Sequence, residues 1–417
     1  MNILLKSVKI LDPNNVGLHS KKRDILIKNG KIEKIAVRID AGKGATVINK
    51  KNLHVSPGWF DGGVNFGEPG FEERETIDHG LSVAAKSGFT DVVLHTGTNP
   101  VPDSSSDIVF LKNAGKGRAT NLHPLGSLTA KSEGRNLAEL YDMKNAGAKG
   151  FYDFKKPLIN GNLLKIALQY VQGFDGLVYS FPLDLEIAGK GVVNEGEIST
   201  KLGLKGIPSL AEELQIVRDL FILEYTGGKL HIPTISTANA VKLISDAKRK
   251  GLNVSCSTAI HNLWYTDATL GDFDSNYKTI PPLRTSKDVK ALVKGVKDGI
   301  IDFVITDHMP TNIELKKVEF DHAAYGTIGL ESAFGALNTL FGAEVTVDIL
   351  TRGRKHYALE SHEIKEGAIA SISLFDPDET YVFGKEHIYS TSKNSIFLNR
   401  ELKGKVYGII NNGQLIF

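Results

Sequence analysis

Cysteine is almost missing from this chain, since Cys256 is the single thiol in 417 residues. One thiol excludes an intrachain disulfide and any zinc site built from several thiolates, and a chain without disulfides is typical of a reducing compartment. Long apolar runs are missing too. No stretch approaches the roughly 20 residues of a membrane span, and the start MNILLKSVKILDPNN has too short an apolar run for a signal peptide. The sequence therefore predicts a cytoplasmic protein without a membrane segment.

An excess of charge of one sign is also missing. Lys and Arg number 50 against 48 Asp and Glu, a formal charge of +2, whereas binding a nucleic-acid backbone usually needs a strong basic excess. We therefore expect no nucleic-acid partner. Hydrophobic residues at 41% and charged residues at 24% lie near the averages for soluble globular proteins, which excludes a largely disordered chain. The length suits two or three domains, or one large barrel with an appendage.

Both ends of the chain have the character of β-strands. Residues 2–10, 24–28 and 31–38 are short and rich in Ile, Leu and Val, and turn sequences such as Asn29-Gly30 separate them. The segments 371–377 and 406–416 near the C-terminus have the same style. These patterns predict hairpins, and we expect the two ends to meet in one small β-sandwich.

The middle of the chain alternates short apolar strands with helical segments, which is typical of parallel strands joined by crossover helices. The expected strands are 91–94, 150–152, 176–179, 229–232, 253–256 and 303–306, and two of the expected helices cover 210–224 and 238–251. This pattern predicts an α/β protein with a (β/α)8 TIM-like barrel. The expected organisation is the first part of the sandwich over 1–54, the barrel over 55–365 and the second part of the sandwich over 366–417.

Several motifs carry a resemblance to a known family. The stretch from Pro57 to Gly70, PGWFDGGVNFGEPG, resembles the opening of class I dihydroorotases of the amidohydrolase superfamily, in which a Pro-Gly-x-x-Asp strand leads into His-x-His and Arg-Glu-Pro-Gly. Further matching motifs follow in the family's order: Asn194-Glu195-Gly196-Glu197, Leu202 to Pro208, His231-Ile232-Pro233-Thr234, Ile280 to Arg284, Thr306 to Pro310 and Gly329-Leu330-Glu331. The resemblance implies an amidohydrolase barrel and a place in pyrimidine biosynthesis.

The same resemblance implies a metal site that this chain lacks in most of its parts. The family holds two zinc ions with four histidines, a bridging acidic residue or carboxylated lysine, and an aspartate that is also the general base. Those six positions are here Gly63, Asn65, Asp153, Ser180, Thr234 and Asp307. Only Asp153 and Asp307 can ligate a metal, whereas a catalytic zinc normally has three protein ligands. We therefore expect no zinc cofactor and a vestigial Asp307 at the position of the base.

The positions that bind the substrate in this family are altered as well as the metal ligands. Gly67 stands where the family has the arginine that holds the substrate carboxylate, and Gly97 stands where it has an asparagine. Ile280 and Thr311 replace a further asparagine and a histidine. The resemblance therefore leaves no substrate-binding residue to assign, and it implies loss of catalysis more than a change of metal.

Two alternatives stay open for the ionisable residues. A relocated metal site is conceivable, because histidines lie near predicted strand ends on the catalytic face: His95, His123, His231, His261 and His308. The structural interpretation is simpler. In it Asp307 accepts hydrogen bonds from loop amides, Asp153 pairs with Lys155 or Lys156, and Cys256 is a small core residue.

Two functional hypotheses follow. The first is an inactive dihydroorotase-like chain that serves as a structural or regulatory partner, since it resembles the inactive chains that some bacteria use as subunits of aspartate transcarbamoylase. Aspartate transcarbamoylase or another pyrimidine enzyme is then the expected partner, and a homo-oligomer is expected. The alternative is an active amidohydrolase with an altered site, in which Asp307 moves a proton while a cyclic amide C–N bond is hydrolysed.

Overall fold

The structure is a computed structural model that describes residues 2–42 and 44–417. Met1 and Lys43, both within the predicted segment 1–54, lie outside the described residues. Within the described ranges, none of the helices is long and apolar enough to cross a membrane.

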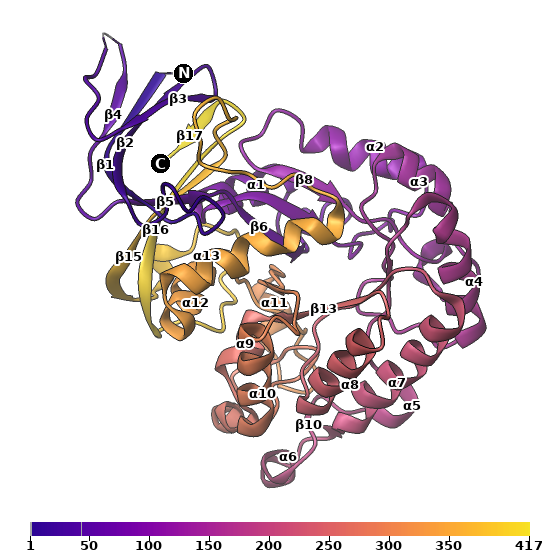
Figure 1. Cartoon of the computed structure of the whole chain (residues 1–417). Coiled ribbons are helices and arrows are strands. Elements are labelled where there is room, and N and C mark those ends of the chain that lie inside the picture. The colour runs from indigo at the N-terminus through magenta and orange to yellow at the C-terminus, as the bar shows by residue number, and fades with distance from the viewer. Residues whose placement is uncertain (1, 43) are drawn as a thin grey trace.

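The two ends of the chain build one eight-stranded sheet. Its strands are β1 (Asn2–Ile10), β2 (Lys22–Lys28), β3 (Lys31–Ala36), β4 (Thr46–Ile48), β5 (His54–Pro57), β15 (Ile372–Val382), β16 (Glu401–Asn411) and β17 (Gln414–Ile416). Their order is β17-β16-β15-β5-β1-β2-β3, with β4 beside β1, and both termini lie in this sheet (Figure 1). The predicted pairing of the two chain ends is confirmed.

The sheet curls around an apolar core of its own. Isoleucines and leucines of strands from both ends, including Ile3, Ile25, Leu374 and Ile410, form one buried cluster. The Ile32 amide donates to the Ala368 carbonyl at 2.9 Å, which links the edge strand β3 to the segment that leads into β15. The sheet runs through Pro57 and begins again at Ile372, while the boundaries 1–54, 55–365 and 366–417 stay predictions.

The middle of the chain forms a closed parallel barrel. Its strands are β6 (Trp59–Val64), β7 (Phe89–Leu94), β8 (Asn121–Pro124), β9 (Val178–Tyr179), β12 (Leu230–Ile232), β13 (Val254–Ala259) and β14 (Phe303–Ile305). The segment predicted as a strand over 150–152 contributes only Phe151, which bridges Gly126 and Val178 and so fills the fourth place in the circle. A bridge between Val64 and His308 closes the barrel. The predicted (β/α)8 architecture is confirmed.

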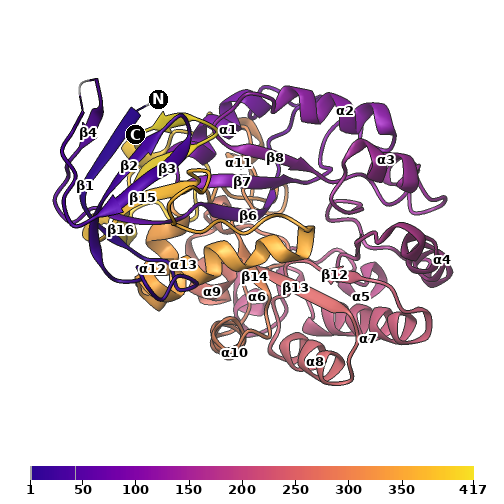
Figure 2. The same cartoon turned by 45° about the horizontal axis from the view of Figure 1, so that its top comes forward.

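Helices surround the barrel strands (Figure 2). They are α1 (Ile77–Lys86), α2 (Ser105–Ala114), α3 (Leu140–Ala146), α4 (Gly161–Val171), α7 (Ser209–Thr226), α8 (Ala238–Arg249), α10 (Ser286–Lys297), α12 (Ala333–Phe341) and α13 (Ala343–Arg352). The helices predicted over 210–224 and 238–251 correspond to α7 and α8. Short elements occupy the connections: α5 (Leu185–Ala188), β10 (Val193–Asn194), α6 (Glu197–Leu202), β11 (Gly206–Ile207), α9 (Ile260–Trp264) and α11 (Ile313–Lys316).

Trp59 joins the barrel to the terminal sheet. Its ring is fully buried and stacks on Phe334 of α12, with ring centroids 4.7 Å apart, and it contacts Phe375 of β15 at 5.3 Å. Its indole N–H donates to Ser56 Oγ at 2.9 Å, so the polar atom of the ring is satisfied. These contacts hold the start of β6 in place. β6 ends at the barrel mouth, by which we mean the end of the barrel where the C-terminal ends of its strands lie.

Candidate functional site

The C-terminal ends of the barrel strands bring most of the predicted site residues together. In a (β/α)8 barrel this end carries the chemistry, because the loops that follow the strands converge there. Asn65 follows β6, His95 follows β7, and Ser180, Thr234 and Asp307 follow β9, β12 and β14. All five residues are buried.

The ring of His95 fills the space beside Gly63. A Cβ atom added to Gly63 would lie 2.7 Å from His95 Cε1, so the imidazole ring would have to shift. His95 Nε2 lies 3.3 Å from the Gly62 carbonyl, and the ring packs against Tyr152 and Phe154 with centroids 5.3 Å apart in each case. Burial, and then the nearby charge of Lys155, lowers the pKa of His95 to about 3. A neutral, packed imidazole therefore stands where a longer side chain at position 63 would need room.

The neighbouring glycines are closed to larger residues for similar reasons. A Cβ atom at Gly97 would lie 2.5 Å from Asn65 Nδ2 and 2.6 Å from Phe154 Cδ1. Gly67 has a φ of +116°, a conformation that favours glycine, and a Cβ atom there would lie 2.8 Å from the Phe71 carbonyl oxygen. The local backbone and the neighbouring side chains thus leave room for glycine at positions 67 and 97, but not for a larger residue unless they shift.

A buried ion pair lies at the centre of the mouth. Lys155 Nζ is 2.8 Å from Asp307 Oδ2, and the two side chains are only 10% and 3% exposed. Burial raises the pKa of Asp307, and the Lys155 ammonium opposes that shift. The expectation that Asp307 accepts loop amides is wrong, as is the pairing of Lys155 with Asp153, because the lysine reaches across the barrel to Asp307.

Asp153 binds the loop that follows β8. Its Oδ1 accepts hydrogen bonds from the amides of Leu128 and Thr129 at 3.0 Å each, and its Oδ2 accepts from Thr129 Oγ1 at 2.5 Å. Burial raises the pKa of Asp153. The predicted alternative partner Lys156 instead donates to the Ser132 carbonyl at 3.3 Å. Asp153 therefore lies at the predicted strand end with both of its oxygens engaged by the protein.

Ser180 and Thr234 have different surroundings. Ser180 Oγ donates to Asp219 Oδ2 on α7 at 2.5 Å, and Arg218 holds the same carboxylate at 2.8 Å. Thr234 has a φ of +49°, and its buried Oγ1 has no hydrogen-bond partner among the described residues. The Ser180 hydroxyl is thus hydrogen-bonded to helix α7, whereas the Thr234 hydroxyl is bound to no other described residue.

Asp61 of β6 connects the backbone of two strands next to the barrel mouth. Its Oδ1 accepts hydrogen bonds from the amides of Gly63 and Thr306 at 3.1 and 3.2 Å, and its Oδ2 accepts from the Thr306 hydroxyl. Burial is the main cause that raises the pKa of Asp61 to about 7. Asp61, the aspartate of the Pro-Gly-x-x-Asp motif, therefore ties β6 to the residue that follows β14.

Three of the candidate histidines are buried at or near the mouth, and their ring nitrogens differ in their hydrogen-bond partners. His231 Nδ1 and Nε2 contact the hydroxyls of Ser255 and Ser257 at 2.8 and 3.1 Å. His308 Nδ1 accepts from the Gly329 amide at 3.2 Å, while its Nε2 and that of His261 have no partner within the described ranges. Burial lowers the pKa of His261 and of His308 to about 3. Burial also lowers the pKa of His231, so all three rings are neutral near pH 7.

His123 lies at the opposite end of the barrel, so its predicted place on the catalytic face is wrong. Its Nε2 is 2.9 Å from Asp91 Oδ1, and Arg354 contacts the same carboxylate at 2.7 Å. Arg354 also donates to the carbonyl of Gly58, which precedes β6, so this cluster belongs to the N-terminal ends of the strands. Across residues 2–42 and 44–417, no group of three or more His, Cys, Asp or Glu side chains is placed to hold a metal ion.

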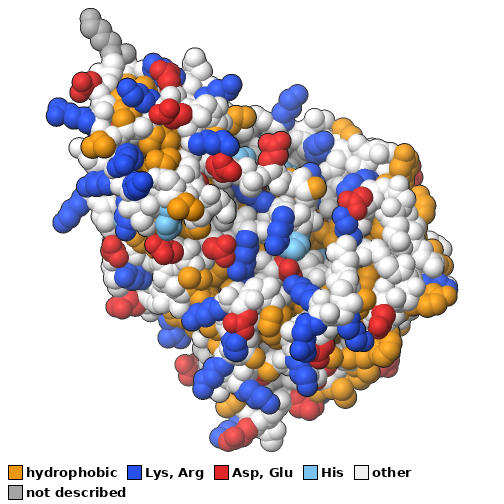
Figure 3. All heavy atoms as spheres, viewed as in Figure 1, with side chains coloured by type: hydrophobic (Ala, Val, Ile, Leu, Met, Phe, Trp, Pro, Cys, Tyr) orange, Lys and Arg blue, Asp and Glu red, His pale blue; other side chains and the backbone are white. Residues whose placement is uncertain are grey.

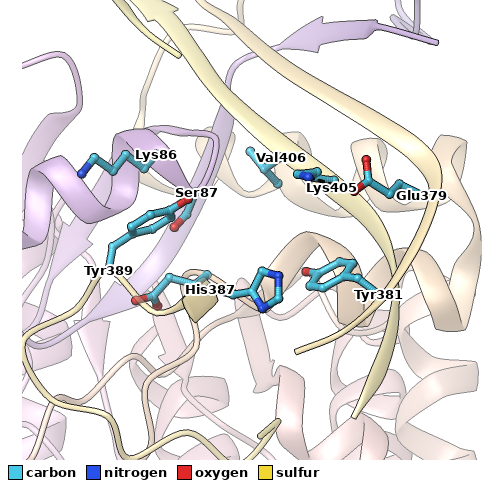
Figure 4. A pocket seen from close by; sticks show the side chains of 9 residues that line it. Lys86, Ser87, Glu379, Tyr381, His387, Tyr389, Lys405 and Val406 are labelled. Carbon is cyan, nitrogen blue, oxygen red and sulfur yellow. Dashed lines mark hydrogen bonds and ion pairs between the residues drawn. The ribbon is translucent and has the colours of Figure 1, made fainter. Parts of the chain in front are cut away.

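A separate recess lies outside the barrel, between α1 and the strands β15 and β16 (Figure 4). The rings of Tyr381 and His387 lie side by side there with centroids 4.8 Å apart. Buried Glu331 forms part of the lining, and its Oε1 accepts from the Ser390 amide at 2.9 Å. The volume is about 60 Å³, far below the roughly 300–1,000 Å³ of clefts that bind small molecules. The recess is too small for a metabolite.

Sequence reasoning missed the two residues that define the mouth. In the sequence Lys155 is recognisable only as a neighbour of Asp153, and His95 only as a possible metal ligand. A lysine two residues beyond a strand-end aspartate was the available signal, but its partner Asp307 is 152 positions away. The contact of His95 with Gly63 gives no local signal, because it depends on how β6 and β7 lie beside each other.

Known proteins resemble this chain over its whole length. A family model described as dihydro-orotase-like matches residues 53–240. A dihydroorotase of Pelotomaculum thermopropionicum is 37% identical, with 100% of this chain and 98% of that protein covered, and one of Geotalea daltonii is 36% identical, with 100% and 99% covered. The fold also matches an L-hydantoinase (dihydropyrimidinase) from Arthrobacter aurescens, at 19% identity, a TM-score of 0.82 and coverage of 100% and 97%.

The ion pair at the mouth generates a stability prediction. We expect Lys155→Met and Asp307→Asn each to lower the free energy of unfolding by about 3–5 kcal/mol, because each leaves one buried charge without its partner. The double variant is expected to lose less than the sum, with a coupling of about 1–3 kcal/mol in a double-mutant cycle measured by urea unfolding. Lys156→Met is the control and should change stability by less than about 0.5 kcal/mol. Additive losses would contradict the pairing.

The buried imidazoles generate a pH prediction. His261 has a pKa of about 3 in the folded chain against 6.5 unfolded, so only the unfolded chain gains a proton as the pH falls below 6.5. Acid therefore removes the stability that His261 contributes, by up to about 1.4 kcal/mol per pH unit between pH 6.5 and 3. We expect the stability difference between the unmodified protein and His261→Gln to fall with up to this slope as the pH is lowered from 6.5 to 4. The difference for Leu263→Val should be constant, and a constant difference for His261→Gln would contradict the assignment.

Proposed function

The chain belongs to the dihydroorotase family of the amidohydrolase superfamily, and we propose that it is a member that has lost catalysis and serves as a structural or regulatory partner of another enzyme of pyrimidine biosynthesis. The observation that carries this proposal is the Lys155–Asp307 ion pair. The carboxylate at the family's base position is held at 2.8 Å by an ammonium group of the same chain. A base that is bound in this way is not free to orient a water molecule or to take its proton.

The residues of the mouth do not fit the two zinc ions that the family implies. Zinc is bound by imidazole, thiolate or carboxylate groups at about 2.0–2.3 Å, and the four histidine positions hold Gly63, Asn65, Ser180 and Thr234. The two remaining carboxylates already have protein partners, Asp153 in the loop after β8 and Asp307 at Lys155. Divalent cations would also meet the positive charge of Lys155 at the position where they would have to bind.

Restoring a histidine at position 63 would not rebuild the metal site. The Cβ atom alone would lie 2.7 Å from His95 Cε1, so the new ring could enter only if His95 moved. An arginine at position 67 meets a similar obstacle, because φ is +116° and the Phe71 carbonyl lies close. These contacts support a mouth whose packing has adapted to the residues it now has, and they support loss of catalysis more than a recent change of one ligand.

Hydrolysis with an altered site is the second candidate. It is favoured by one observation, that Asp307 is retained at the end of β14 with a pKa raised by burial, which is a property of general bases. In that reaction Asp307 would have to release the Lys155 ammonium and accept a proton from a water molecule. The two candidates differ in what Asp307 does, so catalysis with the unmodified protein distinguishes them.

Activity is the direct test of the first candidate. We expect the purified protein to show no hydrolysis of dihydroorotate above the rate without enzyme, with or without added zinc, because positions 63, 65, 180 and 234 supply no imidazole. An active dihydroorotase assayed in parallel serves as the positive control. Turnover by the unmodified protein that disappears in Asp307→Ala would establish the second candidate and refute the first.

Association is the test of the partner role. We expect affinity purification of the tagged chain from its native lysate to retain aspartate transcarbamoylase or another pyrimidine enzyme in a fixed ratio, as the resemblance to noncatalytic subunits implies. Mass spectrometry of the eluate and light scattering of the complex measure this. An inactive chain that elutes free of pyrimidine enzymes under gentle conditions would remove the partner role while leaving the loss of catalysis intact.

A further inference from the structure

A basic recess lies at the N-terminal end of the barrel, opposite the mouth. It has a volume of about 640 Å³, within the roughly 300–1,000 Å³ of clefts that bind small molecules. Its walls come from the end of α2 and the loop that follows it, from β8, from the loop after α3, and from the turn between β16 and β17. The residues that line the basic recess include Lys112, Lys116, Arg118, His123, Lys149 and Asn412.

The charges of this lining have one sign. Three lysines and one arginine line the basic recess, and neither Asp nor Glu belongs to the described residues that line it. Arg118 has an acidic partner, because its Nε lies 2.8 Å from Asp78 Oδ1, but the three lysines form no ion pair with any described residue. Figure 3 shows Lys and Arg side chains at the surface beside α2. Since the whole chain has a formal charge of only +2, this concentration of cations is a local property.

The dipoles of the neighbouring helices explain only part of this charge. Lys112 lies in the last turn of α2, where a cation offsets the partial negative charge of a helix C-terminus. Lys116 and Lys149 lie beyond the ends of α2 and α3, in loops. Burial, and then the positive charges of Lys144 and Lys112, lowers the pKa of Lys149. The fold therefore opposes the charge of Lys149, and an anion bound beside it would relieve that repulsion.

Hydrogen bonds within the protein fix the walls of the basic recess. Lys112 Nζ donates to the Ala146 carbonyl at 3.2 Å, which links α2 to the end of α3. Asn412 Nδ2, in the turn between β16 and β17, donates to the Arg118 carbonyl at 2.9 Å and to Asn121 Oδ1 at 2.8 Å. The loop after α2 is thus attached to the terminal sheet. Walls that are fixed before a ligand arrives lose little conformational freedom when it binds.

We propose that the basic recess binds a small polyanion with two or three linked phosphate groups, such as a nucleoside triphosphate. Lysine and arginine are the side chains that bind phosphate groups in proteins, and linked phosphates present several negative charges to several cations. Leu122 and Pro124 also line the basic recess and provide an apolar contact for the rest of the ligand. The basic recess and Asp307 lie at opposite ends of the barrel, so this binding does not depend on the loss of catalysis.

Calorimetric titration of the full-length protein with tripolyphosphate, ATP, AMP and adenosine, without divalent cations, tests the proposal. We expect tripolyphosphate and ATP to bind at one site per chain, AMP to bind at least about 10-fold more weakly because it has fewer charges, and adenosine not to bind. A tighter affinity for ATP than for tripolyphosphate would identify the nucleoside as part of the ligand. Equal affinities would identify the linked phosphates alone.

Substitution of the unpaired lysines locates the site. Lys116→Gln and Lys149→Gln should each weaken the binding of tripolyphosphate by at least about 10-fold, as expected when a charged hydrogen bond is lost. Lys290→Gln is the matched control, because Lys290 is an exposed lysine on α10, and it should leave the affinity unchanged. Circular dichroism of the three variants confirms that they fold.

Chemical labelling of the unmodified protein gives a second readout. Tripolyphosphate should prevent the acetylation of Lys116 and Lys149, measured by mass spectrometry, and should not change the acetylation of Lys290. Failure of both tripolyphosphate and ATP to bind would overturn the proposal. So would binding that Lys116→Gln and Lys149→Gln leave intact, or an equal affinity for AMP and ATP. Tighter binding of a single-stranded RNA than of tripolyphosphate would also overturn it, because it would indicate a nucleic-acid surface.

Discussion

A buried carboxylate must be neutralised, and at the mouth of this barrel an ammonium group from the same chain neutralises Asp307. Asp307 is 3% exposed, and taking an unpaired carboxylate out of water costs several kcal/mol. In a metal-dependent barrel the cation would come from solution. Here it arrives on the side chain of Lys155, so the balance of charge at the mouth is completed when the chain folds.

The charge of Lys155 also affects the histidines that surround the ion pair. The positive charge of Lys155 adds to burial in lowering the pKa values of His95 and His261, so these rings stay neutral and pack as hydrophobic groups. The ring of His95 then fills the space beside Gly63, and Asn65 and Phe154 fill the space beside Gly97. The charge of Asp307 is thus balanced by Lys155, and side chains of the protein fill the space beside Gly63 and Gly97.

Sequence reasoning predicted the architecture well because the fold depends on local patterns. Short apolar strands and amphipathic helices such as α8 are recognisable within a dozen residues, and the Asn29-Gly30 turn has the positive φ angles expected of a hairpin. Phe151 was harder, since a single bridged residue makes an incomplete strand. The partners in the site could not be predicted, because Lys155 and Asp307 lie on opposite sides of the barrel and only the closed circle of strands brings them together. The same holds for His123, whose local pattern does not reveal which end of the barrel its ring faces.

Calorimetric titration of zinc into the purified, chelator-treated protein tests the central claim that Lys155 takes the place of a metal at Asp307. The account predicts no stoichiometric binding at micromolar concentration, and the same weak heats for the unmodified protein and for Asp307→Asn. Binding of one or two zinc ions per chain that Asp307→Asn abolishes would contradict the account, because it would show that the carboxylate leaves its ammonium partner for a metal.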